Sequence, residues 1–131
     1  MGARLSLVIL AVGDVAQAAR FYREVFGWPQ QVDEAVYAEF ALPENQRLGL
    51  YARAAFARNT GELPAVIAPG ALTATELYFT VDDPAEVGKR LIAAGARQLS
   101  ALAPRDWGDE AAYFADLDGT VLVVAHPLSE G

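Results

Sequence analysis

Residues 76–95 read ELYFTVDDPAEVGKRLIAAG, and they predict a strand that is followed directly by a helix. In the first part of this stretch, apolar and more polar residues alternate with the period of two that is typical of a strand with one buried face. One face of the strand is therefore expected to pack against a helix, and the other is where we look for function. The apolar residues, on the face expected to pack against a helix, are Leu77, Phe79 and Val81, and the more polar residues on the other face are Glu76, Tyr78 and Thr80.

The helix that follows this strand has a clear beginning and end. Asp83 is a suitable N-cap, Pro84 suits the first helical position, and Glu86 completes a capping box. Apolar residues then recur at helical spacing as far as Gly95, a residue type that commonly ends helices. The stretch is thus a complete strand and helix.

The first half of the chain contains a similar unit. Residues 5–12 alternate like a strand with two apolar faces, and Asp14 and Gln17 are placed to cap a helix that Gly27 ends. When the two halves are superimposed, Asp14 lies opposite Asp83, which gives a repeat of about 70 residues. The chain is therefore interpreted as a duplicated unit.

Two further strands are predicted in the first half, at residues 36–42 and 48–52, on either side of a turn. The alternation in residues 36–42 places Tyr37 and Glu39 on the open face. The core side is expected to hold Val36, Ala38, Phe40 and Leu42. Residues 56–70 contain two prolines and two glycines, and we expect them to link the halves.

The second half follows the same order after its helix. An irregular stretch contains Pro104, Asp106, Trp107 and Gly108, and two strands are predicted at residues 111–115 and 120–125, with Asp118 and Gly119 in a tight hairpin. Each half thus has the order strand, helix, strand, strand, with room for one more strand. Because a helix covers only one face of each sheet, two such units could enclose a cavity.

Composition limits the possible classes of protein. A chain of 131 residues suits one domain, and no segment approaches the roughly 20 apolar residues of a membrane span. The absence of cysteine excludes disulfides and thiolate metal sites. A net charge of -7 disfavours nucleic acid and anionic membranes as partners, and favours neutral or cationic ligands. We expect a soluble, cytoplasmic protein.

Three segments carry a family resemblance: VGDVAQAARFYREVFGW at residues 12–28, VDDPAEVGKRLIAAGAR at 81–97 and YFADLDGTVLVV at 113–124. They resemble the vicinal oxygen chelate superfamily, which includes glyoxalase I, extradiol dioxygenases and the bleomycin and fosfomycin resistance proteins. The resemblance implies an α+β fold of two tandem βαβββ modules with curved mixed sheets enclosing a cavity, often as a homodimer. The expected modules cover about residues 4–56 and 73–128 of a single domain, with a linker at about 57–72.

The resemblance also implies metal-ligand positions on the first and last strands of the modules. Carried over to this chain, they fall at Leu7, Gly49, Glu76 and Val123, of which only Glu76 has a donor group. The single histidine, His126, is expected to point away from the face of Val123 and to be an ordinary strand-end residue. We therefore expect no metal, no other cofactor and no set of catalytic residues.

The open faces instead suggest ligand binding. Tyrosines provide flat apolar area with a polar tip, and carboxylates provide negative charge, so together they suit a planar, hydroxylated or cationic organic ligand. Two alternatives remain: Tyr37 and Tyr51 complete a dimer interface, or Trp107 is a structural cap over the second module. Glu76 contacts ligand or solvent, or is hydrogen-bonded by a neighbouring tyrosine. The predicted ligand-binding residues are Tyr37, Glu39, Tyr51, Glu76, Tyr78, Trp107 and Tyr113.

Three functional hypotheses follow. The first is a metal-independent binding protein, similar to bleomycin resistance proteins, that sequesters a small planar or cationic compound such as an antibiotic. The second is a metal-dependent glyoxalase-like lyase, isomerase or dioxygenase whose metal site is rebuilt around Glu76 and Glu39. The third is a structural dimer without a ligand. The first is favoured, with a homodimer and a small organic ligand as the expected partners.

Overall fold

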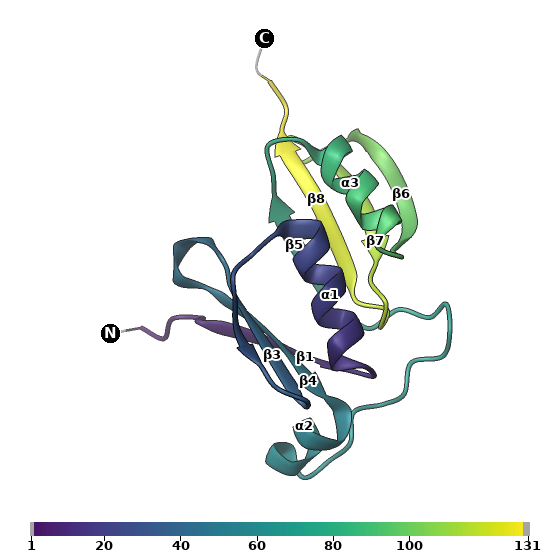
Figure 1. Cartoon of the computed structure of the whole chain (residues 1–131). Helices are drawn as coiled ribbons and strands as arrows, with labels where there is room; N and C mark the ends of the chain where they lie inside the picture. Colours follow the sequence, from purple (N-terminus) through teal and green to yellow (C-terminus); the bar gives the residue numbers. More distant parts are fainter. Residues whose placement is uncertain (1, 130–131) are drawn as a thin grey trace. The chain divides into compact units, whose positions relative to one another are not determined.

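The computed structural model describes residues 2–129 and divides into two compact units between Val66 and Ile67. Each unit contains a four-stranded mixed sheet with a helix that follows its first strand (Figure 1). The predicted α+β fold of two tandem βαβββ modules is therefore confirmed.

Unit 1, the part up to Val66, has the sheet order β1-β4-β3-β2. β1 and β4 are parallel, and the other neighbouring strands are antiparallel. The elements are β1 (Leu7–Val12), α1 (Val15–Phe26), β2 (Gln30–Asp33), β3 (Tyr37–Ala41), the short 3-10 helix η1 (Pro43–Asn45), β4 (Arg47–Ala52) and α2 (Arg53–Thr60).

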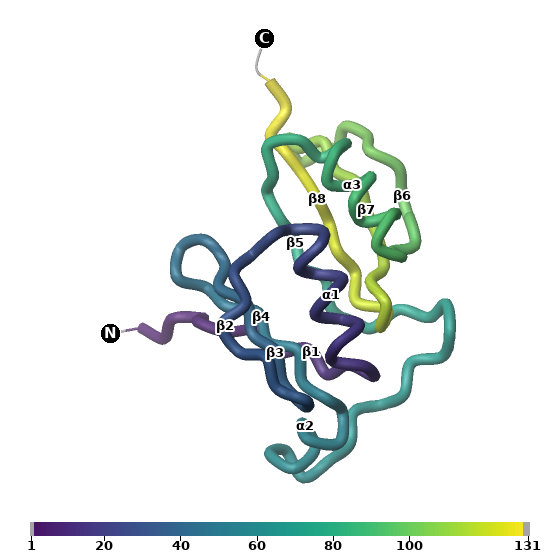
Figure 2. Tube along the Cα trace, in the orientation of Figure 1, coloured from purple at the N-terminus to yellow at the C-terminus, as the bar shows by residue number. Residues whose placement is uncertain are grey.

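Unit 2, the part from Ile67, repeats this topology with the sheet order β5-β8-β7-β6. The trace between α2 and β5 has no regular secondary structure (Figure 2). No helix in residues 2–129 is both long enough and apolar enough to cross a membrane. The elements are β5 (Glu76–Thr80), α3 (Pro84–Ala93), β6 (Arg97–Pro104), β7 (Asp109–Ala115) and β8 (Val121–Pro127).

The N-caps of α1 and α3 are those that the sequence predicts. The Asp14 side chain accepts a hydrogen bond from the Gln17 amide at 3.0 Å, and Gly27 ends α1 in a left-handed conformation. In the same way, the Asp83 carboxylate accepts from the Glu86 amide at 3.1 Å at the start of α3. A cap of this kind stabilises a helix by about 1 kcal/mol, so local sequence fixes where both helices begin.

Each helix covers one sheet face with apolar side chains. In unit 1, α1 contacts β3 and β4 and buries Tyr22 and Val25 completely or almost so. In unit 2, α3 lies along β7 and β8 (Figure 1), and Gly88 lets the ring of Phe114 approach closely. Each large apolar side chain buried in this way contributes about 1.5–3 kcal/mol. The larger buried sheet residues on these faces include Leu10, Val12, Ala38, Phe40, Leu48, Leu50, Phe114, Leu122 and Val124.

The predicted hairpin between β7 and β8 is held by one aspartate. Oδ1 of Asp116 accepts hydrogen bonds from the amides of Asp118 at 2.9 Å and Thr120 at 2.8 Å. Gly119 has φ +86°, and a Cβ there would lie 2.6 Å from the carbonyl oxygen of Ala71. Both the backbone conformation and the close approach therefore require glycine.

The structure differs from the sequence prediction at β2, β6, α2 and Val36. β2 and β6 were not located, since QQVD is polar and β6 has register shifts that interrupt its alternation. Residues at the start of the expected linker form α2, because the run RAAFARNT precedes the prolines and glycines. Val36 was predicted to face the core, but it lies just before β3 and is 40% exposed.

Candidate functional site

The open face of unit 1 gathers three of the predicted ligand-binding residues. In the β3–β4 ladder Tyr37 lies opposite Tyr51, and Glu39 lies opposite Gly49. Because cross-strand partners point to the same side of a sheet, these four residues share one face, opposite to the face covered by α1. Gly49 in turn pairs with Ile9 of β1, so the same face continues across the parallel edge of the sheet.

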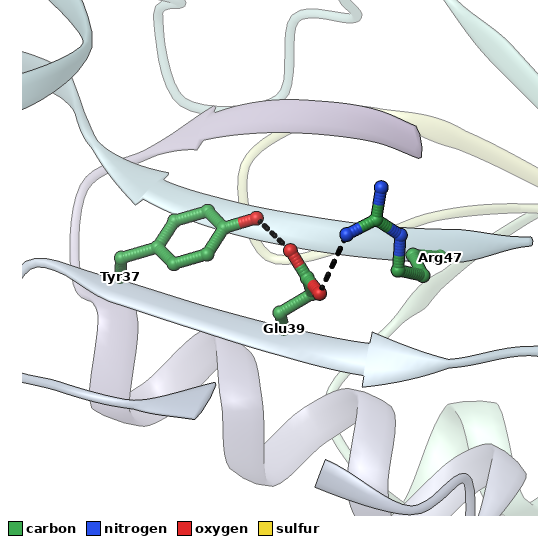
Figure 3. A network of polar contacts seen from close by, with 3 residues as sticks. All are labelled: Tyr37, Glu39 and Arg47. Carbon is green, nitrogen blue, oxygen red and sulfur yellow. Dashed lines mark hydrogen bonds and ion pairs between the residues drawn. The ribbon is translucent and has the colours of Figure 1, made fainter. Parts of the chain in front are cut away.

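Tyr37, Glu39 and Arg47 form a polar network on this face (Figure 3). The Tyr37 hydroxyl donates to Oε1 of Glu39 at 2.6 Å, and Nη1 of Arg47 donates to Oε2 of the same carboxylate at 3.3 Å. Glu39 is only 8% exposed, so both of its oxygens are engaged inside the protein. Burial, and then the hydrogen bond to Glu39, raise the pKa of Tyr37 above its ordinary value.

Gly49 makes room for the tyrosine of this network. A Cβ at position 49 would lie 2.4 Å from the hydroxyl oxygen of Tyr37 and 2.9 Å from its ring. The ring of Tyr37 therefore occupies the space in which a side chain at residue 49 would begin. No residue larger than glycine fits there unless the tyrosine moves.

Tyr51 extends the aromatic surface of unit 1 toward α2. Its ring meets Tyr37 edge to face at 5.2 Å and Phe56 at 6.3 Å, and Asn59 Nδ2 donates to its hydroxyl at 3.4 Å. Phe56 and Asn59 were not predicted as site residues. The sequence feature that could have identified them is their spacing of three within a run of helix-favouring residues, which places both side chains on one face of a helix.

In unit 2, Tyr78 and Trp107 are brought together on the surface. The Tyr78 hydroxyl donates to Oδ2 of Asp109 at 2.5 Å and accepts a hydrogen bond from Nε1 of Trp107 at 2.9 Å. Tyr78 is 40% exposed and Trp107 is 54% exposed. Desolvation, and then the hydrogen bond to Asp109, raise the pKa of Tyr78. Two large aromatic side chains are thus held in a fixed arrangement while they remain accessible.

Glu76 and Tyr113 lie on the same face of unit 2 as Tyr78. Glu76 and Tyr78 are two residues apart on β5, and the ladders place Val123 beside both Tyr78 and Tyr113. Glu76 is exposed, and its carboxylate has no hydrogen bond or ion pair to any residue in the part of the chain that the structure describes. Tyr113 is half-buried against a small apolar cluster of Ala111, Val121, Val123 and Ala125.

The positions that would hold a metal in the superfamily do not fit one here. Leu7 and Val123 have alkyl side chains, and the space above Gly49 is filled by Tyr37. Among residues 2–129, no group of three or more His, Cys, Asp or Glu side chains is arranged to hold a metal ion. His126 instead has Nδ1 2.8 Å from the carbonyl oxygen of Val81, as a strand-end residue of β8.

A family comparison agrees with this topology. The model of the glyoxalase-like domain matches residues 7–125, which is most of the chain. The chain belongs to the glyoxalase-like domain family. This places it in the vicinal oxygen chelate superfamily and confirms the resemblance of its sequence motifs. No curated protein matches this glyoxalase-like chain significantly.

Solved structures of glyoxalase-like proteins share the fold. A glyoxalase-related enzyme from Fulvimarina pelagi superimposes with a TM-score of 0.82 at 23% identity, over 94% of this chain and 87% of that one. A glyoxalase/bleomycin resistance protein/dioxygenase family enzyme from Burkholderia phytofirmans PsJN gives 0.80 at 21%, over 96% and 100%. A lactoylglutathione lyase from Agrobacterium tumefaciens gives 0.70 at 21%, over 96% and 95%. At these identities the likeness establishes the fold alone.

Proposed function

We propose that this glyoxalase-like protein binds a small planar organic cation without a metal ion, and that it holds the ligand rather than transforming it. The observation that carries the proposal is the exposed pair of Tyr78 and Trp107, fixed by two hydrogen bonds on the open face of unit 2. Rigid, exposed aromatic rings bind flat ligands at a low cost in conformational entropy.

Charge supports a cationic ligand. Residues 67–131 contain ten acidic and four basic residues, so most of the net charge of -7 belongs to unit 2. Glu76 offers an exposed carboxylate on the same strand face as Tyr78. A positive group on a planar ligand would interact with this carboxylate and with the ring faces of Tyr78 and Trp107.

The donor chemistry of the open faces supports independence from metal. A catalytic metal centre needs several oxygen, nitrogen or sulfur ligands together with an open position for substrate. Leu7 and Val123 supply none, and Glu39 is already engaged by Tyr37 and Arg47. Glu76 alone would be a weak ligand.

Tryptophan fluorescence tests the proposal directly. Purified protein is titrated with a panel of planar aromatic cations, with planar aromatic anions as controls, in the presence of a chelator. We expect saturable quenching by at least one cation, and we expect Trp107→Phe to abolish it. Trp28 is stacked on Phe26 with ring centroids 4.3 Å apart, so Trp28→Phe serves as the matched control that retains the response.

Other outcomes would favour the rival functions. Activity or binding that appears only after a divalent ion is added would support a glyoxalase-like enzyme with a rebuilt metal site. No binding by any compound, together with a stable dimer, would support a structural role. The homodimer stays a prediction, and sedimentation velocity of the purified protein would test it. The cytoplasmic location also stays a prediction.

A further inference from the structure

We propose that Arg105 is the positioning residue of the ligand site in unit 2, because it fixes the turn that presents Trp107 and covers one face of Tyr113. The part of this inference that concerns affinity rests on the proposed function, whereas the part that concerns the turn can be tested without any ligand. Arg105 was not among the residues predicted from the sequence.

The guanidinium of Arg105 bridges an irregular part of the sheet. Nη2 donates to Oγ of Ser100 at 2.9 Å, to the carbonyl of Ala101 at 2.9 Å and to the carbonyl of Ala111 at 2.8 Å, and Nε donates to Ala111 at 3.2 Å. The register of β6 against β7 shifts on both sides of Ser100, so the regular ladder is interrupted where these acceptors lie. The side chain therefore ties β6 to β7 where the backbone ladder is irregular.

The backbone of Arg105 closes the turn that contains Trp107. Its amide donates to the carbonyl of Asp109 at 2.7 Å, and its carbonyl accepts from the amide of Gly108 at 3.3 Å. On the other side, Trp107 and Asp109 are both bonded to the hydroxyl of Tyr78. The indole is thus held between two anchors, Arg105 on the β6–β7 side and Tyr78 on β5.

Arg105 also decides which aromatic surface a cation can use. Its Cζ atom lies 5.1 Å from the ring centroid of Tyr113, so a positive charge already covers one face of that ring. A cationic ligand would be repelled there. The exposed rings of Tyr78 and Trp107, near Glu76, remain as the cation-binding surface, and Tyr113 contributes packing instead.

The test compares Arg105→Lys and Arg105→Gln with Arg97→Gln as the matched control. Arg97 is the first residue of β6, and Arg105 directly follows the last, but within residues 2–129 the guanidinium of Arg97 bonds only to the carbonyl of Gly70. Lysine lacks the planar fork that reaches several acceptors, so Arg105→Lys is expected to fail as a rescue. Should the Arg105 variants not fold, Ser100→Ala removes a single acceptor and gives the same readouts at smaller amplitude.

The first readout is the indole N–H cross-peak of Trp107 in a proton–nitrogen NMR spectrum, assigned with Trp107→Phe. Both Arg105 variants are expected to shift or broaden this peak and to leave that of Trp28 in place, and Arg97→Gln is expected to change neither. Unchanged Trp107 peaks in folded Arg105 variants would overturn the inference, whether or not any compound binds.

The second readout is the affinity for the planar cation found with the wild-type protein. We expect about a tenfold loss in both Arg105 variants and about none in Arg97→Gln, since tenfold is the scale of one well-placed contact. A shifted Trp107 peak with unchanged affinity would overturn the role of Arg105 in binding while leaving the proposed function intact. Failure of the wild-type protein to bind would count against the proposed function only, because the peak still reports on the turn.

Discussion

The two units have the same topology, but they use their open faces differently. In unit 1, Tyr37 lies over Gly49, and both oxygens of Glu39 are engaged by neighbouring side chains. In unit 2, the position equivalent to Gly49 in the sheet order is Val123, and Glu76 remains exposed without a side-chain partner among residues 2–129. One scaffold thus satisfies its polar groups internally in one copy and leaves aromatic and acidic groups accessible in the other.

A single small residue underlies much of this difference. Glycine at position 49 allows the tyrosine ring to lie across the strand, and the ring then brings its hydroxyl to Glu39. Valine at position 123 fills the same place in unit 2 with a buried side chain, beside Tyr78 and Tyr113. The comparison predicts that substitutions at these positions should have unequal effects on stability and on binding.

The largest effect is expected for Gly49→Val, which would make unit 1 resemble unit 2. A Cβ at this position overlaps the side chain of Tyr37, so the ring must leave and the bond to Glu39 must break. We expect the free energy of unfolding to fall by about 2 to 3 kcal/mol, as measured by urea denaturation. Adding Tyr37→Ala should recover part of this loss, and strictly additive losses would refute the steric explanation.

Tyr37→Phe should have an intermediate effect that depends on pH. Loss of the hydrogen bond to Glu39 is expected to destabilise the protein by about 1 kcal/mol at neutral pH. The pKa of Tyr37 is raised in the folded protein, so the tyrosine stays protonated above about pH 10, where an unfolded tyrosine ionises. The contribution of the protonated Tyr37 to the free energy of unfolding is therefore full below about pH 10 and is lost as the pH rises further.

Urea denaturation of both proteins on either side of about pH 10 measures the pH-dependent part. The wild-type protein should lose more stability than Tyr37→Phe as the pH rises. Tyr78 contributes in the same direction, because its pKa is also raised, so Tyr78→Phe is a useful second comparison. Equal slopes for the wild-type protein and Tyr37→Phe would show that Tyr37 ionises alike in the folded and unfolded states.

Substitutions of Glu76 and Glu39 should differ in their effect on ligand binding. Glu76→Gln removes an exposed carboxylate from the open face of unit 2, and we expect about a tenfold weaker affinity for a planar cation, as measured by fluorescence titration. Glu39→Gln removes a charge that Arg47 already neutralises, so the affinity should change little. The reverse order of effects would assign the cation to the face of unit 1.

The smallest effect on stability is expected for Trp107→Phe. The Trp107 side chain is 54% exposed and its indole N–H donates to the hydroxyl of Tyr78, so the free energy of unfolding should change by about 0.5 kcal/mol or less. A thermal melt followed by circular dichroism checks this value. A loss several times larger would favour the alternative that Trp107 is a structural cap over the second module.

Much of the fold could be predicted from the sequence because its determinants are local. Alternation identified the faces of β1 and β5, and the side chains of Asp14 and Asp83 marked the starts of α1 and α3. β6 was missed because a bulged strand loses the period of two. Ser100 and Ala101 of β6 accept hydrogen bonds from the guanidinium of Arg105 instead, and a short window of sequence does not reveal such a contact.

The site could be predicted only as far as strand faces. Period-two alternation placed Tyr37 and Glu39 together, and Glu76 and Tyr78 together. Asp109, by contrast, is bonded to Tyr78 across 31 positions of sequence, and that contact depends on the register of the folded sheet. The ligand assignments themselves stay predictions until binding is measured.

The most direct test of the central claim is isothermal titration calorimetry with the best planar cation. Protein treated with a chelator is titrated alone and again after the addition of Mn²⁺, Ni²⁺ or Zn²⁺. We predict the same affinity in every case, within about twofold, and no stoichiometric heat from the metal alone. If the planar cation binds only when a metal ion is bound stoichiometrically, the proposal of metal-independent binding is wrong. That result would favour a metal-dependent enzyme.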